Sequence, residues 1–442
     1  MTLAHLTAHA AAEAMRRGDI TSEELVSACL ERIDAREPDV GAFAHLDREQ
    51  ALADARAADH ARRAGRGFGR LNGVPIAVKD IIDTAGRPTE HGTPIHAGRR
   101  ALQDAACVAA LKSAGAVILG KTVTTELALL TPARTRNPVD PTRSPGGSSA
   151  GSAAAVADAM VPVALGSQTA GSVLRPASYC GVYGFKPTFG LISRRGVLMQ
   201  SHTLDTVGLF ARDIADLALI TDCLGAHDPD DPASYPRSAP NHLDIALSPA
   251  PLPPRLALIK TPAWETHASP ALREAFGELA AELGADCVEV DLAGLDAVIE
   301  WQRLVQLAEN GGWYGRYLDH AGDLLSPGLR ARLEEGSRVP VRAYLDAIAA
   351  REAAYTQVAE VLDDFTAILT PAAPGVAPLL SEGITGSPIF NGLWTYLGMP
   401  AVSVPLLEVD GLPLGVQLVA ARQDDGRLLR TARALVERLT PA

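Results

Sequence analysis

The segment "SPGGSSAGSAAAV" (residues 144–156) crowds serine and glycine into its first half and alanine into its second. Gly/Ser tracts are usually solvated linkers. Apolar sequence flanks this tract on both sides, however, with "GAVILGKTVTTELALL" (115–130) before it and "AAAVADAMVPVALG" (153–166) from its end. Glycine-rich loops within core sequence are typical of places where the backbone comes close to another group. We therefore expect a loop inside a folded core.

The flanking apolar runs alternate with helical patterns. Residues 73–83 ("GVPIAVKDIID") and 114–122 ("AGAVILGKT") are bounded by glycine or proline and predict buried strands. Helical patterns cover 21–37, with Thr21 as N-cap and Pro38 as the stop, and 48–65. The alternation continues to about residue 225 and favours an α/β fold with a central mixed, mostly parallel twisted sheet, covered by helices on both faces.

The second half of the chain adds two further units. Residues 255–292 predict a strand, a helix and a strand, and 400–420 predict a hairpin that turns at Asp410-Gly411. We interpret the proline-rich stretch at 229–254 as an exposed loop and not as a domain boundary. We expect one domain over 1–442, with N-terminal helices over 1–66, a catalytic core over 67–225, and the remaining core and pocket elements over 226–442.

Composition limits the classes of function. The 442 residues are 47% hydrophobic, and 40 basic against 52 acidic residues give a net charge of −12, which argues against a nucleic-acid partner. Five widely spaced cysteines without a CxxC pair indicate a reduced, cytoplasmic protein. The N-terminus has no signal-peptide pattern, and the most apolar long window, 153–173, is too interrupted for a membrane span.

Three short motifs match known functional patterns, but the sequence around each one does not fit the corresponding chemistry. Residues 115–122 fit G-x-x-x-x-G-K-[ST], but the four middle residues are apolar and belong in a strand, so a nucleotide-binding or scaffold protein stays only as an alternative. "GSSAG" (147–151) fits a nucleophile elbow centred on Ser149, but no apolar strand leads directly into it. His91 and His96 share one face of neither a helix nor a strand, and we expect no metal.

A second Gly/Ser loop lies in "LGSQTAGSVLRPASYCGVYGFKP" (165–187). Its serine, Ser172, lies 172 − 148 = 24 residues after Ser148 of the first loop. Lys79 ends the apolar run "PIAVK". Two glycine-flanked serines and one lysine in an apolar strand form a set that can support nucleophilic catalysis.

At this point the chain resembles the amidase signature hydrolases over nearly its whole length. The resemblance rests on "GVPIAVKD" (73–80), "GKTVTTE" (120–126), "SPGGSSAGSAAAVA" (144–157), the 166–176 loop, "YCGVYGFKPTFG" (179–190), "LDTVGLFAR" (204–212) and "GMPAVSVPLLEVDGLPLGVQLV" (398–419). It implies the single-domain amidase signature fold and a Ser-cisSer-Lys triad, in which Lys79 is the base, Ser148 the bridging serine after a cis peptide bond, and Ser172 the nucleophile. The implied oxyanion hole consists of the backbone N–H groups of Thr169, Ala170, Gly171 and Ser172.

The chemistry agrees with these residue types. A serine hydroxyl needs a base to become a nucleophile. Lysine can serve only when it is neutral, and burial in an apolar strand disfavours its charged form. Ser148 can relay the proton because a hydroxyl both donates and accepts hydrogen bonds.

Three further residues are predicted to bind substrate: Gln168, Ser149 and Arg175. Gln168 and the sequence "GSVLRP" (171–176) resemble a malonamidase-like branch, in which the arginine matching Arg175 holds a substrate carboxylate. The alternative is that Arg175 pairs internally, for instance with Asp205, and only shapes the site. Both alternatives stay open. Apolar and aromatic residues that could form the pocket wall include Leu129, Leu130, Thr131, Trp301, Trp313 and Trp394.

The first predicted function is an amide hydrolase that needs no metal or cofactor. It would release ammonia or an amine from a small amide through an acyl-serine intermediate. Its expected partner is a small-molecule amide, with no nucleic acid and no membrane, and a homodimer is considered as its assembly. The alternative is the glutaminase-type subunit of a transamidation complex, which shares the same signature and requires a partner protein.

Overall fold

The computed structural model describes residues 2–66, 69–238 and 241–440. Within these residues eleven strands form one sheet in the order β1-β3-β2-β4-β6-β5-β10-β11-β9-β7-β8. The strands are β1 (Phe43–Leu46), β2 (Pro75–Lys79), β3 (Val117–Thr122), β4 (Val163–Gln168), β5 (Tyr183–Lys186), β6 (Thr206–Ala211), β7 (Leu256–Leu258), β8 (Cys287–Glu289), β9 (Ala367–Pro371), β10 (Ala401–Val409) and β11 (Leu412–Val419).

The sheet is mixed, and its strand directions correct one prediction. β2 runs parallel to β3 and β4, and β7 runs parallel to β8 and β9. The other neighbouring pairs are antiparallel, so antiparallel pairing predominates and the expected mostly parallel sheet is wrong. One cause lies at β10 and β11, which are joined by two residues, because a tight turn can only produce antiparallel strands.

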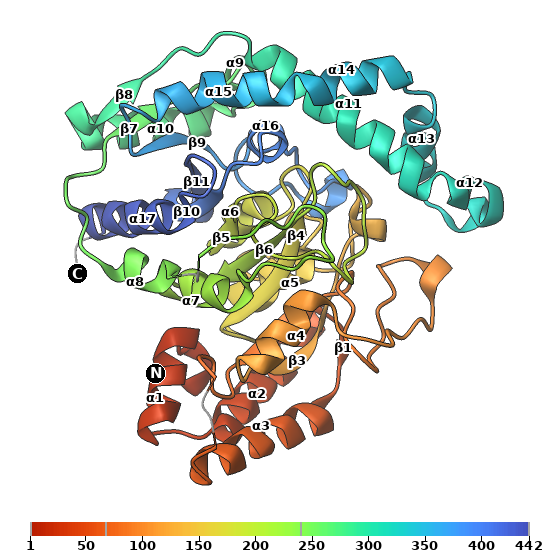
Figure 1. Cartoon of the computed structure of the whole chain (residues 1–442), viewed down its shortest axis with the longest axis vertical. Coiled ribbons are helices and arrows are strands. Elements are labelled where there is room, and N and C mark those ends of the chain that lie inside the picture. Colours follow the sequence, from red (N-terminus) through yellow and green to blue (C-terminus); the bar gives the residue numbers. More distant parts are fainter. Residues whose placement is uncertain (1, 67–68, 239–240, 441–442) are drawn as a thin grey trace.

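Helices flank the sheet and form a single-domain α/β fold (Figure 1). Helices α1 to α3 gather at the N-terminal end of the molecule, and α11 to α15 form a layer at the opposite end. The helices are α1 (Ala8–Arg17), α2 (Ser22–Val40), α3 (Arg48–Arg63), α4 (Ala106–Ser113), α5 (Ala150–Ala157), α6 (Leu174–Cys180), α7 (Ile214–Leu224), α8 (His242–Leu247), α9 (Ala263–His267), α10 (Pro270–Leu283), α11 (Leu295–Tyr314), α12 (Arg316–His320), α13 (Pro327–Gly336), α14 (Val341–Ala349), α15 (Arg351–Val361), α16 (Gly392–Tyr396) and α17 (Asp425–Leu439).

Local sequence signals explain several element ends. The Thr21 side chain accepts the N–H of Glu24, whose carboxylate accepts the N–H of Thr21, so the predicted start of α2 is confirmed. The predicted stop at Pro38 is wrong, since the helix continues to Val40 and ends at Gly41, which has a left-handed φ of 64°. The predicted hairpin turn at Asp410-Gly411 is also confirmed.

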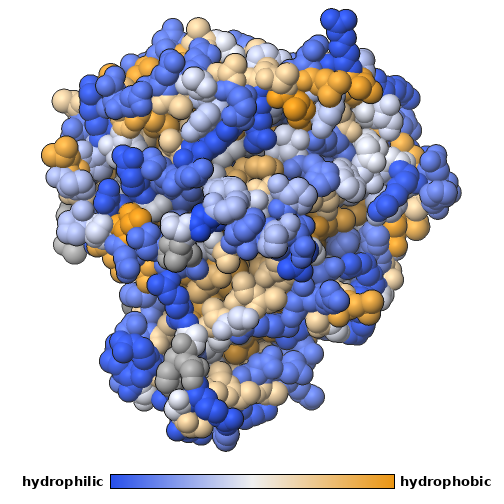
Figure 2. Space-filling model, viewed as in Figure 1, coloured by the Kyte–Doolittle hydropathy of each residue, from blue (hydrophilic) through white to orange (hydrophobic). Residues whose placement is uncertain are grey.

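The apolar segments that flank the two serine loops are buried in the main core. The window 153–173 folds as the end of α5, strand β4 and the following loop. In the part of the chain that the structure describes, no helix is both long and apolar enough to cross a membrane. Most of the face in Figure 2 is hydrophilic, with scattered apolar patches. The exposed apolar side chains of the described residues include Val341 and Leu345 of α14.

Candidate active site

Strand order brings the predicted site residues to one edge of the sheet. Lys79 is the last residue of β2, and the loop 169–173 follows β4 directly. Because β2 and β4 are parallel neighbours, their C-terminal ends lie at the same edge. The first serine loop ends there as well, since Ser148 and Ser149 precede α5.

Lys79 is fully buried and its amine contacts two hydroxyl groups. Nζ lies 2.7 Å from Ser148 Oγ and 2.9 Å from Ser167 Oγ. The Gly147–Ser148 peptide bond is cis. Burial lowers the pKa of Lys79 to about 7, partly opposed by the negative charge of Asp205. A substantial share of this amine is therefore neutral near pH 7.

Ser167 was not predicted from the sequence as a site residue. A neutral lysine amine has two N–H donors and one lone pair, so it can donate to Ser167 while it accepts from Ser148. Ser167 therefore helps to fix which way the lone pair of Lys79 points. A usable signal existed, because Ser167 is a polar side chain in the otherwise apolar run "VALGS" (163–167).

The loop that carries Ser172 is held in place by buried side chains. Gln168 Oε1 accepts the N–H groups of Val173 and Leu174 at 2.9 and 3.1 Å, and its Nε2 donates to Thr395 Oγ1 at 3.0 Å. Thr395 Oγ1 in turn donates to the carbonyl of Ala170 at 2.7 Å. The loop is thus fixed from β4 and from α16.

The backbone of this loop lies close to its neighbours and keeps donors available. A Cβ at Gly171 would lie 2.4 Å from Asn391 Oδ1, so a glycine is needed there. Among the described residues, the N–H groups of Ala170, Gly171 and Ser172 have no hydrogen-bond acceptor. These donors are free to bind a developing oxyanion.

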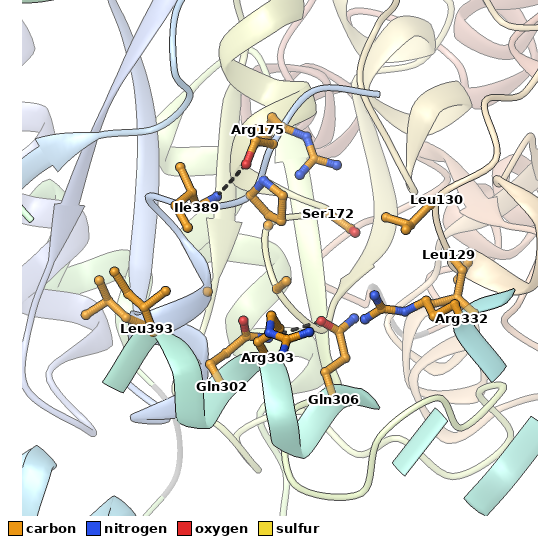
Figure 3. A pocket seen from close by; sticks show the side chains of 17 residues that line it. Leu129, Leu130, Ser172, Arg175, Gln302, Arg303, Gln306, Arg332, Ile389 and Leu393 are labelled. Carbon is orange, nitrogen blue, oxygen red and sulfur yellow. Dashed lines mark hydrogen bonds between the residues drawn. The ribbon is translucent and has the colours of Figure 1, made fainter. Parts of the chain in front are cut away.

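Ser172 lines a cavity of about 240 Å³ and is partly exposed within it (Figure 3). Arg175 lies beside this cavity and is 3% exposed. Its Nη2 donates to the carbonyl of Gly147 at 2.7 Å and so ties the Ser172 loop to the Ser148 loop. In the described part of the chain, Arg175 does not pair with Asp205. Its Nε and Nη1 are buried and have no partner among the described residues, which leaves them able to bind an anion.

The other two residues predicted to bind substrate do not line this cavity. Ser149 is fully buried, and its Oγ accepts the N–H of Ser167 and donates to the Ser167 carbonyl, both at 3.3 Å. Gln168 is also fully buried and braces the loop as described. Arg175 is the one of the three that lines the cavity.

The far side of the cavity carries residues that the sequence did not indicate. Arg303, Gln302 and Gln306 come from α11, and Arg332 comes from α13 (Figure 3). Arg303 pairs with acidic residues outside the cavity lining, whereas Arg332 Nε donates to the amide oxygen of Asn310 at 3.0 Å. None of the described residues that line the cavity is an aspartate or a glutamate, so the charged side chains of its lining are the three arginines. Of the candidate wall residues, Leu129 and Leu130 line it.

Two motifs that the sequence analysis set aside have structural roles. Residues 117–122 form β3 and not a phosphate-binding loop, and Lys121 donates to Thr89 Oγ1 at 2.8 Å and to Asp80 Oδ1 at 3.3 Å. His91 and His96 stack edge to face with their ring centroids 4.8 Å apart. Within the described ranges, no group of three or more His, Cys, Asp or Glu is arranged to hold a metal ion.

Comparison with known proteins places this site in a family. The model of the family described as Amidase matches residues 24–429. The chain belongs to the amidase family. The family predicted from the sequence is therefore confirmed, and the chain is an amidase-type enzyme acting on C–N amide bonds. The finer placement in a malonamidase-like branch stays a prediction.

The curated relatives carry a more specific name. The chain is 37% identical to the A subunit of the glutamyl-tRNA(Gln) amidotransferase of Chloroflexus aurantiacus, covering 99% of this chain and 97% of that protein. It is 34% identical to the protein of the same name from Moorella thermoacetica, with coverages of 98% and 96%. A full-length match to subunits of a complex corrects the first predicted function, a small-amide hydrolase working alone.

The same relatives correct the predicted partners. Their name includes a tRNA and describes one subunit of an assembly, so the expectation of a small-molecule amide as the sole partner, with no nucleic acid, is wrong. The physical reason is that a net charge of −12 describes this chain alone and says nothing of the surface that a second protein contributes.

Solved structures share the fold closely. A chain from a structure titled "An unexpected vestigial protein complex reveals the evolutionary origins of an s-triazine catabolic enzyme" is 31% identical, with a TM-score of 0.90 and 98% coverage of both chains. The native peptide amidase from Stenotrophomonas maltophilia is 29% identical, with a TM-score of 0.86 and coverages of 98% and 97%.

Proposed function

We propose that this chain is the glutaminase-type subunit of a transamidation complex. It cleaves the side-chain amide of glutamine, and the ammonia passes to a partner protein that amidates glutamate bound to tRNA. The observation that carries this proposal is the match, over nearly the full length of both chains, to proteins named as one component of such an amidotransferase.

In the proposed first step, Ser172 Oγ attacks the side-chain carbonyl carbon of glutamine. Its proton passes to Ser148, and the proton of Ser148 passes to the neutral amine of Lys79, which lies 2.7 Å away. The tetrahedral oxyanion is bound by the free N–H groups of the loop after β4. This step leaves Lys79 charged and the substrate carbon bonded to Ser172.

In the proposed second step, Lys79 returns its proton through Ser148 to the leaving nitrogen, and the C–N bond breaks to release ammonia. A water molecule then attacks the glutamyl ester, and the same two residues remove its proton and return it to Ser172 Oγ. The products are glutamate and free enzyme. Each proton that Lys79 accepts is returned, so the cycle needs no external acid or base.

An arginine of the cavity can explain how glutamine, the donor of the amide nitrogen, is held. Arg332 lies across the cavity from Arg175, with Ser172 between them in the view of Figure 3. A guanidinium without a carboxylate partner favours an anionic ligand. We assign Arg332 to the α-carboxylate of glutamine, while the amide lies at Ser172.

The proposal is tested by isolating the full-length chain from its own cells with any proteins that copurify. The complex is then assayed for ammonia release from L-glutamine and for glutamine-dependent amidation of glutamyl-tRNA(Gln). Equal amounts of glutamate and amidated tRNA are expected. A complex that assembles but leaves glutamine intact, with or without tRNA, would overturn the proposal.

Replacing Arg332 with alanine is expected to raise KM for glutamine about 10- to 100-fold and to change kcat little, because a charged hydrogen bond to a remote carboxylate is lost. Steady-state kinetics of ammonia release measures this split. Arg303→Ala is the matched control, since Arg303 already pairs with Glu300 and Glu335. An equal rise in KM for both variants would contradict the assignment of Arg332.

A further inference from the structure

Asp205 is a buried carboxylate that the steps above do not use. It lies just before β6, and its Oδ1 accepts the hydroxyl of Thr169 at 2.6 Å. Its Oδ2 accepts the N–H groups of Gln200 and Ser201 at 2.7 and 2.9 Å. All three partners are donors, and three donors suit a carboxylate in its ionised form even though burial raises the pKa of Asp205.

Asp205 has no salt-bridge partner among the described residues. Its nearest cationic neighbour in the loop, Arg194, uses its guanidinium to pair with Asp231 at 2.9 Å and reaches only the backbone carbonyl of Asp205, at 3.4 Å. The negative charge of Asp205 is therefore not cancelled by a direct ion pair.

Asp205 lies close both to the loop that carries Ser172 and to the residues around Lys79. β4 and β6 are antiparallel, with Gln168 opposite Thr206, so Asp205 stands beside the start of the Ser172 loop. Thr169, which it holds, is the first residue of that loop. Ser167, whose hydroxyl is the second one that contacts the Lys79 amine, lines one small cavity of about 10 Å³ together with Asp205.

We propose that Asp205 is a positioning residue for amide cleavage, which anchors the oxyanion loop through Thr169 and places a negative charge beside the cavity that Ser167, a partner of Lys79, also lines. This inference rests on the proposed roles of Lys79 and Ser172. It gives one residue control over both the geometry of the oxyanion site and the protonation of the base.

Other charged groups around Lys79 are directed elsewhere. Lys79 pairs in register with Thr122, so the adjacent residue on β3, Lys121, points to the opposite face of the sheet. The amine of Lys121 binds Asp80. Ser148 and Ser167 are neutral. Tyr314 on α11 is buried, and this burial, together with the negative charge of Asp205, raises the pKa of its hydroxyl well above the ordinary value, so it stays neutral. The negative charge of Asp205 raises the pKa of Lys79 against the effect of burial.

The test measures how fast a fluorophosphonate labels Ser172 as a function of pH, because this reaction needs the base and the oxyanion site but no knowledge of the substrate. In Asp205→Asn the acidic limb of the rate profile is expected to move to lower pH, since a protonated Lys79 loses a stabilising negative charge. The rate on the plateau is expected to fall about tenfold or more, since a neutral amide holds the Thr169 hydroxyl more weakly than a carboxylate does.

Two variants of Thr169 separate the two roles. Thr169→Val removes the hydrogen bond and keeps the charge, so the plateau rate should fall while the acidic limb stays in place. Thr169→Ser keeps the hydroxyl and should restore the plateau. An unshifted limb in Asp205→Asn would overturn the electrostatic role. If Asp205→Asn does not fold, equal plateau rates for the valine and serine variants overturn the anchoring role.

The labelling assay also separates this inference from the proposed function. If the wild-type complex hydrolyses glutamine but the variants do not show the expected shifts in labelling, the role of Asp205 is refuted and the proposed function is not. If the variants show the shifts in labelling but the wild-type complex does not hydrolyse glutamine, the glutaminase assignment is refuted and the role of Asp205 is supported.

Discussion

Ser172→Ala is expected to lower glutamine hydrolysis about 10⁴- to 10⁶-fold, because the acyl-enzyme can no longer form and only binding and the oxyanion site remain. The side chain is partly exposed at the cavity and takes part in no hydrogen bond among the described residues, so its loss should leave the fold intact. Ammonia release from glutamine by the isolated complex measures the effect.

Two controls make this result specific. The Ser172→Ala complex should still amidate glutamyl-tRNA(Gln) when ammonium chloride replaces glutamine, since we propose that a partner protein carries out the acceptor chemistry. Mass spectrometry of the fluorophosphonate-treated protein should find the adduct on Ser172. An adduct on Ser149 would favour the nucleophile-elbow interpretation and contradict ours.

Lys79→Met is expected to lower kcat by several orders of magnitude, about 10³-fold or more, because no other base among the described residues contacts Ser148. In the wild type the activity should rise as the pH increases through about 7 and level off above it, since only the neutral amine can accept a proton. Methionine fills a similar volume without a buried ammonium, so the melting temperature should not fall. Initial rates from pH 5 to 9 and thermal unfolding measure both effects.

Lys121→Met is the matched control for this prediction. Lys121 is buried beside Asp80, and burial raises the pKa of that carboxyl. Removal of Lys121 leaves a buried acid without its cation, so this variant should lose stability and keep the pH profile of the wild type. If Lys121→Met instead loses the dependence on pH while Lys79→Met stays active, we have assigned the base to the wrong strand.

The pairing of Lys79 with Ser148 could be predicted from the sequence through the resemblance to the amidase signature family, which implies both residues as members of one triad. An apolar run that ends in lysine and a glycine-serine loop before a helix each have a local signature. The placement of Lys79 at a sheet edge follows from the parallel pairing of β2 and β4. Resemblance to a family supplied the roles that pattern alone left open.

Other parts of the site depend on contacts between distant segments. Gln168 and Thr395 are 227 residues apart in the chain, and no local pattern shows that one braces the other. Arg332 lies in "RARLEEG" (330–336), which reads as an ordinary solvated helix. Strand direction was likewise mispredicted, because the packing of β5, β6 and β10 sets it and hydrophobicity does not.

The bonds from Thr395 to Gln168 and Ala170 also bear on the time at which this chain becomes active during its synthesis. A ribosome releases the segments that hold Lys79, Ser148 and Ser172 long before it releases residue 395. Until α16 has emerged and packed, the loop after β4 lacks the brace that holds its donors in place. We therefore expect a nascent or truncated chain that ends before residue 395 to cleave amides poorly.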